Sequence, residues 1–382
     1  MIGRIHLSNF RSFKSKILEF SPKTTVIVGP NASGKTNVIE SVFLLSTGKS
    51  FRARIEEEMV NYKAEIARVK GAVIETPSSA KATEGKRERS GTNLEVVLTR
   101  GEITIGKSPE KYGKSLPAGR QVARKKLLIN GVGKRLIDFA GTFRTVLFGP
   151  WDMELVTDAP SIRRRFLDNV LSQVDREYRR ASLSYEKGLR QRNRLLWRIR
   201  EEGLSRSQLL FWNKLLVKNG DYISQKRQEF IEFVNQRKDF NGQGFDLDYD
   251  KSAISEARLE QYAQEEVAAA TTLVGPHRDD FIFKSIKGIK STKSIKGREL
   301  ARYGSRGEQR MGVLWLKLAE LAYIEKETGE KPTLLLDDIF SELDHEHRDI
   351  VFDVAKAQQT IITTADPHYI EQLGVNSLIK LK

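Results

Sequence analysis

The sequence predicts an α/β fold that a long, mostly helical segment interrupts. A short apolar strand at residues 25–28 enters a glycine-rich loop, which is followed by an apolar helix at residues 37–45. A second apolar strand, at residues 333–336, ends in two carboxylates. Between them, from Pro150 to about Lys238, glycine and proline become rare and the pattern indicates helices.

The glycine-rich loop has the pattern Gly, any four residues, then Gly-Lys-Thr. It consists of Gly29, Pro30, Asn31, Ala32, Ser33, Gly34, Lys35 and Thr36. In such a loop, backbone N–H groups turn inward around the β- and γ-phosphates of a nucleotide, and the helix N-terminus adds partial positive charge. Lys35 is expected to reach the terminal phosphates, and the Thr36 hydroxyl to hold Mg²⁺. A chance Gly/Ser turn is the alternative, but the flanking strand and helix are the context that the phosphate site requires.

The second strand ends in Asp337 and Asp338. If it lies beside the phosphate loop, Asp337 is near the Mg²⁺ shell, and Asp338 is close enough to orient a hydrolytic water. A buried strand followed by an acidic turn would explain the pair without a function. The two motifs together favour a nucleotide site.

The composition favours a polyanionic partner. The 382 residues carry a formal charge of +15, which indicates nucleic acid first and an anionic membrane second, although ribosome-associated and other soluble proteins have similar charge. The length allows two or three domains. The chain has no cysteine, so disulfides, thiolate metal sites and thiol catalysis are excluded.

The N-terminus alternates like a strand and lacks the apolar core of a signal peptide. No apolar run approaches the roughly 20 residues that a membrane span requires. We therefore expect a soluble, cytoplasmic protein without a membrane partner.

The helical segment has two contrasting faces near its middle. One face is apolar and comprises Tyr185, Leu189, Leu196 and Ile199. The opposite face is a basic stripe of Lys187, Arg190, Arg194 and Arg198. The stripe is either a solvated charged face or a surface that contacts DNA phosphates, and the sequence leaves both interpretations open.

Two further turns have candidate roles. His277, Asp279 and Asp280 could form a metal site, but a hydrogen-bonded structural turn is favoured because no other ligand cluster is near in sequence. Ser305 precedes an apolar-periodic helix as a candidate N-cap, and the exposed N–H groups there could bind a second anion. The alternative is simply a capped helix. The polar tracts within residues 76–124 are predicted to be loops on either side of a strand at residues 94–98, and residues 285–297 are predicted to be an exposed hairpin or loop.

These motifs occur with several more specific segments. They are Asn9-Phe10-Arg11-Ser12, residues 159–168, Gln191-Arg192-Asn193, residues 274–280 and Gly304-Ser305-Arg306-Gly307-Glu308-Gln309. In this order the chain resembles the ABC/SMC-type ATPase heads and, within them, the RecF family of bacterial DNA replication and repair proteins. The resemblance covers nearly the whole chain.

The resemblance implies an ABC-type P-loop ATPase head. Its α/β lobe comprises residues 1–149 and 270–382, and its inserted helical lobe comprises residues 150–269. The implied function is DNA binding by an ATP-induced homodimer, with Mg²⁺ and a weak, DNA-stimulated ATPase whose slow hydrolysis acts as a release timer. The family is associated with recombinase loading at single-strand gaps, with RecR and RecO partners.

The resemblance also assigns residues. It implies that Ser305, Arg306, Gly307, Glu308 and Gln309 form a signature that faces the phosphate loop of the opposite subunit. Ser341 and Asp344 match the D-loop, and Arg11 and Asn37 join the nucleotide-binding candidates. Four positions depart from the commoner pattern: Ala32 and Arg306 replace glycines, Asp338 replaces a glutamate, and Ala365 replaces the switch histidine. Neither a Q-loop glutamine nor a γ-phosphate sensor is assigned.

Three alternatives share some of the motifs. The ATPase subunit of a membrane transporter would associate stably with a membrane partner. A P-loop small-molecule kinase would transfer phosphate to an acceptor other than water, and would not need the Ser305 motif. A full SMC protein needs long heptad arms, for which the intervening chain is too short and aperiodic.

Overall fold

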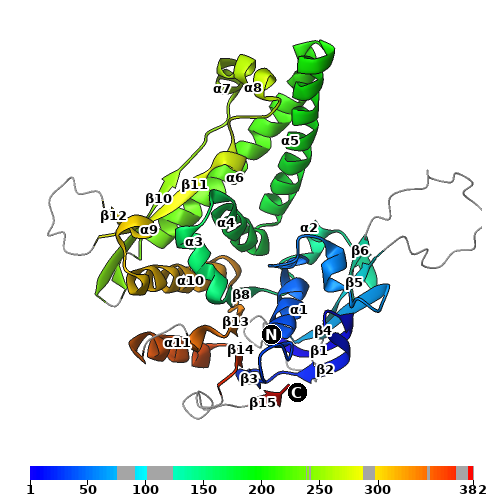
Figure 1. The fold of residues 1–382 in the computed structure, drawn as a ribbon, viewed down its shortest axis with the longest axis vertical. Coiled ribbons are helices and arrows are strands. Elements are labelled where there is room, and N and C mark those ends of the chain that lie inside the picture. Colours follow the sequence, from blue (N-terminus) through cyan, green and yellow to red (C-terminus); the bar gives the residue numbers. More distant parts are fainter. Residues whose placement is uncertain are drawn as a thin grey trace, which may run out of the picture. The chain divides into compact units, whose positions relative to one another are not determined.

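The computed structural model describes residues 1–74, 91–100, 124–237, 239–240, 242–286, 297–341, 345–366 and 377–381. The chain forms two compact units, one made of residues 1–150 and 331–382 and the other of residues 151–330 (Figure 1). Most of the polar sequence that is predicted to form loops lies outside the described residues. Each unit is described by itself.

The second boundary between the units differs from the expected one. The sequence places residues 270–330 with the ATPase lobe, whereas packing places them with the helical unit. The reason is that β11 (Asp280–Ser285) pairs along its length with β10 (Gln243–Asp250), and α10 (Arg306–Thr328) packs on helices of the same unit. As a division of function, the expected lobes stay a prediction.

The first unit contains an antiparallel sheet in the order β2-β1-β4-β5-β6-β7. Its strands are β1 (Ile2–Phe10), β2 (Phe13–Glu19), β4 (Ile66–Ile74), β5 (Gly91–Thr99), β6 (Arg124–Ile129) and β7 (Val132–Lys134). Apolar residues alternate along β1, so that Ile5 and Leu7 are buried while Arg4 is exposed. One face of this sheet therefore belongs to the core.

The same unit contains a parallel sheet in the order β15-β3-β14-β13-β8. Its strands are β3 (Thr24–Val28), β8 (Thr145–Phe148), β13 (Thr333–Asp337), β14 (Thr360–Thr364) and β15 (Ser377–Lys380). Nearly all residues of β3, β8, β13 and β14 are buried, as expected for parallel strands covered on both faces. A strand from the beginning of the chain thus lies between two strands from its end.

Gln359 joins distant parts of this unit. Its side-chain oxygen accepts hydrogen bonds from the Ile2 N–H (2.8 Å) and the Thr333 hydroxyl (2.9 Å). Its amide nitrogen donates to the carbonyls of Ile2 (2.6 Å) and Ser21 (2.9 Å). The amide is buried, so these bonds fix the N-terminal strand against the parallel sheet.

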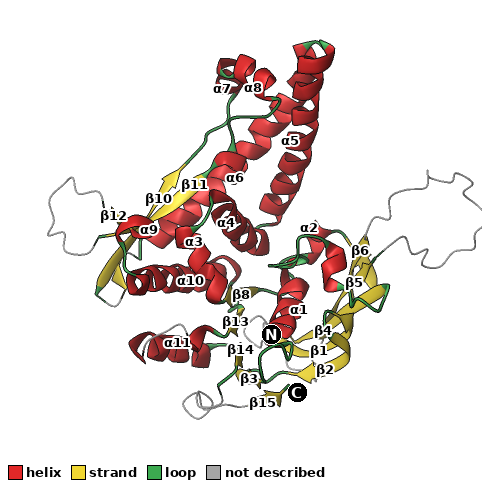
Figure 2. Ribbon diagram, viewed as in Figure 1, coloured by secondary structure: helices red, strands yellow, loops and turns green. Residues whose placement is uncertain are grey.

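Helix α1 (Lys35–Thr47) contacts strands of both sheets (Figure 2). Its residues from Val38 to Thr47 are all buried, and it ends at Gly48 in the left-handed conformation that glycine adopts without strain. The other helical elements of the unit are short or peripheral: η1 (Glu56–Met59), α2 (Leu136–Phe139), η6 (Ile339–Ser341) and α11 (His345–Ala357). The helix that follows the phosphate loop is therefore the centre of the unit.

The second unit is mostly helical and carries a small antiparallel sheet in the order β12-β11-β10-β9 (Figure 2). Its remaining strands are β9 (Asp239–Phe240) and β12 (Arg298–Glu299). Its remaining helices are η3 (Pro150–Met153), α3 (Glu154–Thr157), α4 (Pro160–Val174), α5 (Arg176–Glu202), η4 (Arg206–Leu209), α6 (Leu210–Asn235), α7 (Glu256–Gln261), α8 (Ala263–Ala269), η5 (Pro276–Arg278) and α9 (Leu300–Tyr303). The expected long helices are confirmed.

Helices α5 and α6 form an antiparallel pair with close backbone approach. A Cβ at Gly188 would lie 2.6 Å from the end of the Leu215 side chain, so a larger residue there would require that side chain to move. Beside this contact lies Arg192, which is 1% exposed. Its guanidinium bonds to Asn213 (2.8 Å), Thr272 (2.8 Å) and Glu266 (2.6 Å), and Glu266 is itself fully buried. Each of the three guanidinium nitrogens thus has a protein partner, and the buried charge is paired with a carboxylate.

The His277 turn is structural, as the sequence favours. Its Nδ1 lies 2.8 Å from the Tyr185 hydroxyl and its Nε2 lies 3.0 Å from the Thr272 carbonyl oxygen. Burial lowers the pKa of His277 to about 4, so the ring is neutral at pH 7. Asp279 accepts hydrogen bonds from Arg227 and Tyr249, and Asp280 pairs with Arg163. Within the described ranges, no cluster of three His, Asp or Glu residues could hold a metal ion.

Candidate functional site

The phosphate loop connects β3 to α1, so the strand–loop–helix context that the sequence predicts is confirmed. Gly34 adopts φ 96° immediately before the helix, and a Cβ there would lie 2.7 Å from the Phe13 ring. Ala32 adopts φ 66°. Its methyl group therefore does not prevent the left-handed turn, although this conformation costs about 1–2 kcal/mol for a residue with a Cβ.

Several polar groups of the loop suit a phosphate. The Lys35 ammonium donates hydrogen bonds to the carbonyls of Gly29 (2.7 Å) and Pro30 (3.0 Å), which places it inside the curve of the loop. The Ser33 hydroxyl is buried and has no hydrogen-bond partner among the described residues. A Cβ at Gly29 would lie 2.6 Å from that hydroxyl, so the narrow turn needs glycine. With the N-terminus of a 13-residue helix, these donors fit a nucleotide phosphate.

The structure brings Asp337 and Thr36 together. Asp337 is the last residue of β13, is 2% exposed, and accepts a hydrogen bond from the Thr363 hydroxyl. The Thr36 hydroxyl lies close enough to the carboxylate to affect its pKa. Burial raises the pKa of Asp337, while the two hydroxyls oppose that shift. A hydroxyl and a carboxylate close together supply the oxygen ligands that Mg²⁺ prefers. The two residues predicted to bind Mg²⁺ thus fit that ion.

Asp338 follows in a strained conformation. Its φ is 52°, a value that non-glycine residues seldom adopt, and its side chain is half-buried. Its N–H donates to the Thr363 carbonyl oxygen (3.1 Å) and lies 3.2 Å from the Thr363 hydroxyl oxygen. Strain of this kind persists where the surroundings fix the backbone, and it is concentrated at functional sites.

Arg11 and Asn37 lie beside the loop, where their polar atoms contact protein partners. Arg11 forms a bidentate pair with Glu40 (2.9 and 2.6 Å), which is fully buried in α1. Glu40 also accepts hydrogen bonds from Ser50 and Arg52. Asn37 accepts from Arg52 and donates to Ser12. The sequence interpretation missed Glu40, whose signal is a carboxylate on the apolar helix after the loop. A nucleotide contact for Arg11 and Asn37 stays a prediction.

Ser305 caps α10 in the second unit, as predicted. Its hydroxyl accepts from the Glu308 N–H (3.2 Å), and the Glu308 carboxylate accepts from the Ser305 N–H (2.9 Å), which completes a capping box. Gln309 is buried and donates to the Leu300 carbonyl. Arg306 and Gly307 form the first turn of the helix. Of the D-loop positions, Ser341 ends η6 and Asp344 lies outside the described residues.

The basic stripe is on the solvent-facing side of α5. Lys187, Arg190 and Arg194 are exposed, and Arg198 is half-exposed. On the opposite face Tyr185, Leu196 and Ile199 are buried and Leu189 is half-buried, which confirms the expected two-faced helix. Two stripe residues form ion pairs within the helix, Arg190 with Glu186 (2.7 Å) and Arg198 with Glu202 (2.8 Å). Such exposed pairs are weak, so phosphates could replace the carboxylates.

The stripe leads to a prediction about salt dependence. If the four side chains contact phosphates, their replacement by alanine should reduce the slope of log K against log[salt] by roughly 0.9 per lost contact on duplex DNA, with little change in sequence preference. ATP hydrolysis without DNA should be nearly unchanged. A matched control replaces four exposed lysines elsewhere: Lys218, Lys326, Lys331 and Lys356. An unaltered slope in the stripe variant would support the solvated-face interpretation.

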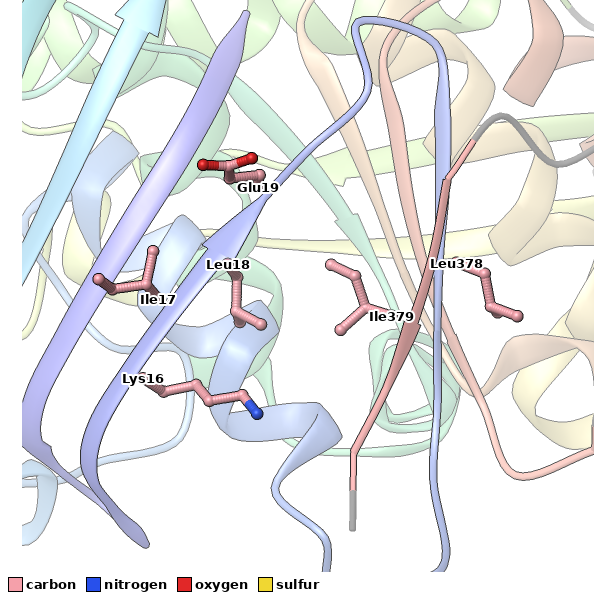
Figure 3. A pocket seen from close by; sticks show the side chains of 6 residues that line it. All are labelled: Lys16, Ile17, Leu18, Glu19, Leu378 and Ile379. Atoms are coloured by element: carbon pink, nitrogen blue, oxygen red, sulfur yellow. The ribbon is translucent and has the colours of Figure 1, made fainter.

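A separate groove of about 480 Å³ lies between β2 and β15 (Figure 3). The described side chains that line it are Lys16, Ile17, Leu18, Glu19, Leu378 and Ile379. None of these belongs to the phosphate loop or to the acidic pair. The groove is therefore distinct from the nucleotide-site candidate.

Known proteins match the whole chain. The family model described as the RecF/RecN/SMC N terminal domain matches residues 1–382. The DNA replication and repair protein RecF of Herpetosiphon aurantiacus is 33% identical over 394 residues, which cover 97% of this chain and 96% of the relative. The chain belongs to the RecF family. The expected resemblance is thus confirmed, and the transporter-subunit and small-molecule-kinase alternatives are set aside.

Solved structures agree with this assignment to the RecF family. One described as the recombination mediator protein RecF-ATPrS in the RecFOR pathway is 29% identical, has a TM-score of 0.79, and covers 100% of this chain and 96% of its own. The Smc head domain from Pyrococcus yayanosii is 13% identical with a TM-score of 0.51, covers 99% of this chain and 94% of its own, and is similar in fold alone. The predicted α/β, ABC-type ATPase head is confirmed. No helix among the residues that the structure describes has the length and apolar character to cross a membrane.

Proposed function

We propose that this RecF-family protein binds ATP and Mg²⁺ at residues 29–36 and uses the nucleotide to switch its binding to DNA during replication and recombinational repair. The observation that supports this most is the proximity of Thr36 and Asp337, because it brings the phosphate loop and the acidic strand together in a Mg²⁺-compatible pair. A similar solved protein, described as RecF-ATPrS, carries a nucleotide in its name.

Each residue of the site has a proposed task. Lys35 exchanges the carbonyls of Gly29 and Pro30 for the terminal phosphates, whose charge its ammonium neutralises. Thr36 and Asp337 hold Mg²⁺, which when bound screens the phosphate charge. Asp338 orients the attacking water. Because its side chain is one methylene shorter than that of glutamate, we expect slow turnover, which suits a release timer.

The remaining proposals follow the family pattern. ATP binding joins two copies of the chain, because residues 305–309 of one copy contact the phosphates held by the other. The dimer then binds duplex DNA or a single-strand/double-strand junction and, with RecR- and RecO-type partners, helps to load recombinase at single-strand gaps. DNA stimulates its weak ATPase. The basic stripe on α5 is the proposed phosphate-contact surface.

The central proposal is tested by measuring DNA binding with ATP, with ADP and without nucleotide. We expect the highest affinity with ATP, because only the ATP-bound dimer is proposed to bind DNA productively. The same titrations at two salt concentrations separate this effect from non-specific attraction by the basic chain. Equal DNA affinity in all three nucleotide states would contradict an ATP switch.

Ser305→Arg tests the proposed dimer. The variant should still bind ATP through Lys35 and Thr36 but should fail to dimerise, because a bulky cation occupies the facing surface. Ser305→Asn is the matched control, since asparagine also caps helices. Sedimentation with ATP measures both. Normal dimerisation and hydrolysis by Ser305→Arg, or only monomers of the unaltered protein with ATP, would show that the arrangement is wrong.

A mixing experiment refines this test. A mixed dimer of Ser305→Arg and Lys35→Ala has one doubly damaged site and one site with both motifs intact. Some hydrolysis should return on mixing if a single site can close the dimer. Failure of the mixture alone is less decisive than the sedimentation result, because closure of the dimer could require both sites.

A further inference from the structure

Thr363 contacts both acidic residues of the candidate site. It lies near the end of β14, is 0% exposed, and stands opposite Asp337 in the parallel register of β13 and β14. Its hydroxyl donates a hydrogen bond to Asp337 Oδ1. The Asp338 N–H donates to the Thr363 carbonyl oxygen and lies within hydrogen-bond distance of its hydroxyl oxygen. One buried residue therefore contacts both the predicted metal ligand and its neighbour.

The other threonines of β14 make different contacts. The hydroxyl of Thr360 is also buried, but it donates to the carbonyl oxygens of Ala355 (3.0 Å) and Gln358 (3.3 Å). The hydroxyl of Thr364 donates to the Asp366 carbonyl oxygen (3.3 Å). In both threonines the hydroxyl therefore bonds only to backbone carbonyls that are near in sequence. The bond from Thr363 instead reaches a carboxylate on the neighbouring strand.

We propose that Thr363 is a positioning residue for the Mg²⁺ site. It fixes the rotation of the Asp337 carboxylate so that its second oxygen is available to the cation, and it supports the strained backbone of Asp338. The proposal rests on the proposed ATP and Mg²⁺ site. Partners of this kind orient metal ligands, and their loss typically lowers metal affinity 10–100-fold.

The position of Thr36 strengthens this assignment. The Thr36 hydroxyl also lies near the Asp337 carboxylate. That hydroxyl is itself a proposed Mg²⁺ ligand, so its position depends on the cation, although a coordinated hydroxyl can still donate its hydrogen to the carboxylate. Thr363 comes from β14 and is not a proposed ligand. It is therefore the partner that can hold Asp337 in the same orientation with and without Mg²⁺.

The test compares three variants of the full chain. Thr363→Val removes the hydroxyl and keeps the shape, Thr363→Ser restores a hydroxyl, and Thr360→Val removes a buried hydroxyl from the same strand without touching Asp337. Binding of a fluorescent ATP analogue is titrated with Mg²⁺ and is repeated in excess chelator. Urea denaturation of each variant measures its stability.

The expected result is specific to the metal. Nucleotide binding becomes tighter as Mg²⁺ is added, and the Mg²⁺ concentration that gives half of this effect should be about 10–100-fold higher in Thr363→Val. Affinity in chelator should change less than about twofold, because the phosphate loop is intact. Thr363→Ser should restore most of the Mg²⁺ response, and Thr360→Val should resemble the unaltered protein. If Thr363→Val does not fold, Thr363→Cys replaces it, since its thiol is a weaker donor, and a smaller increase is expected.

Two outcomes would overturn the proposal. One is an unchanged Mg²⁺ response in Thr363→Val, or in Thr363→Cys where that variant is used. The other is an equal shift in Thr360→Val, which would show that the effect arises from general destabilisation of β14. Failure of the proposed function gives a different result, because the unaltered protein would then bind the nucleotide without any dependence on Mg²⁺. That result would contradict both proposals.

Discussion

Replacing Lys35 by methionine is expected to reduce the ATP hydrolysis rate at least about a hundredfold, the effect usual for the loss of a group that stabilises charge in a transition state. Methionine keeps most of the apolar stem, which is buried, and removes only the ammonium that lies in the curve of the loop. Binding of ATP should also weaken, because the terminal phosphates lose their cation. Steady-state hydrolysis and nucleotide titration measure the two effects.

The control is Lys49→Met, which removes an exposed lysine just after the end of the same helix. The two acids provide contrasting variants. Asp337→Asn should weaken the binding of Mg²⁺ at the site. Asp338→Asn should instead preserve ATP binding and slow the loss of the bound ATP by hydrolysis. Asparagine tolerates the left-handed conformation of residue 338, so this variant keeps the backbone. Turnover at the unaltered rate in Lys35→Met, Asp337→Asn and Asp338→Asn would rule out these roles.

Replacing Arg192 by methionine is expected to destabilise the second unit by about 3–5 kcal/mol. Glu266 is fully buried and would lose its cationic partner, while Asn213 and Thr272 would lose a hydrogen-bond donor. All four tryptophans, Trp151, Trp197, Trp212 and Trp315, belong to this unit. Denaturation in urea followed by tryptophan fluorescence therefore reports on it selectively.

Two controls distinguish the loss of a buried ion pair from the loss of a charge in general. Arg190→Met removes an exposed ion pair with Glu186 and should change stability by only about 0–1 kcal/mol. The double variant Arg192→Met with Glu266→Leu removes both buried charges, and it should be more stable than Arg192→Met alone. A midpoint for Arg192→Met equal to that of the unaltered protein would contradict the importance of this buried pair.

Patterns that are local in sequence predicted local structure well. The phosphate loop, its flanking strand and helix, the Ser305 cap and the structural turn at His277 each depend on a few neighbouring residues. Their chemistry limits the possible backbone conformations, because a left-handed glycine or a capping hydroxyl suits few alternatives. Residue types and spacing therefore sufficed for these elements.

The missed features depend on partners that are distant in sequence. The pairing of β11 with β10 decides where residues 280–285 belong, and no local pattern encodes that register. The bond from Thr363 to Asp337 likewise depends on the alignment of two strands. Glu40 looked like an ordinary helix residue until Arg11 and Arg52 were placed beside it. Such contacts follow from tertiary structure.

The interior position of β3 in the parallel sheet, between β15 and β14, affects how the protein is made. While the ribosome is still adding residues, β3 and the phosphate loop have emerged, but β14 and β15, the two neighbours of β3, have not been translated. At about 5–20 residues per second this interval is on the order of tens of seconds. The apolar residues of β3 and α1 must be shielded from aggregation during that time, whereas residues 151–330 can fold as soon as they emerge. A prematurely terminated nascent chain would therefore contain a folded helical unit and no competent nucleotide site.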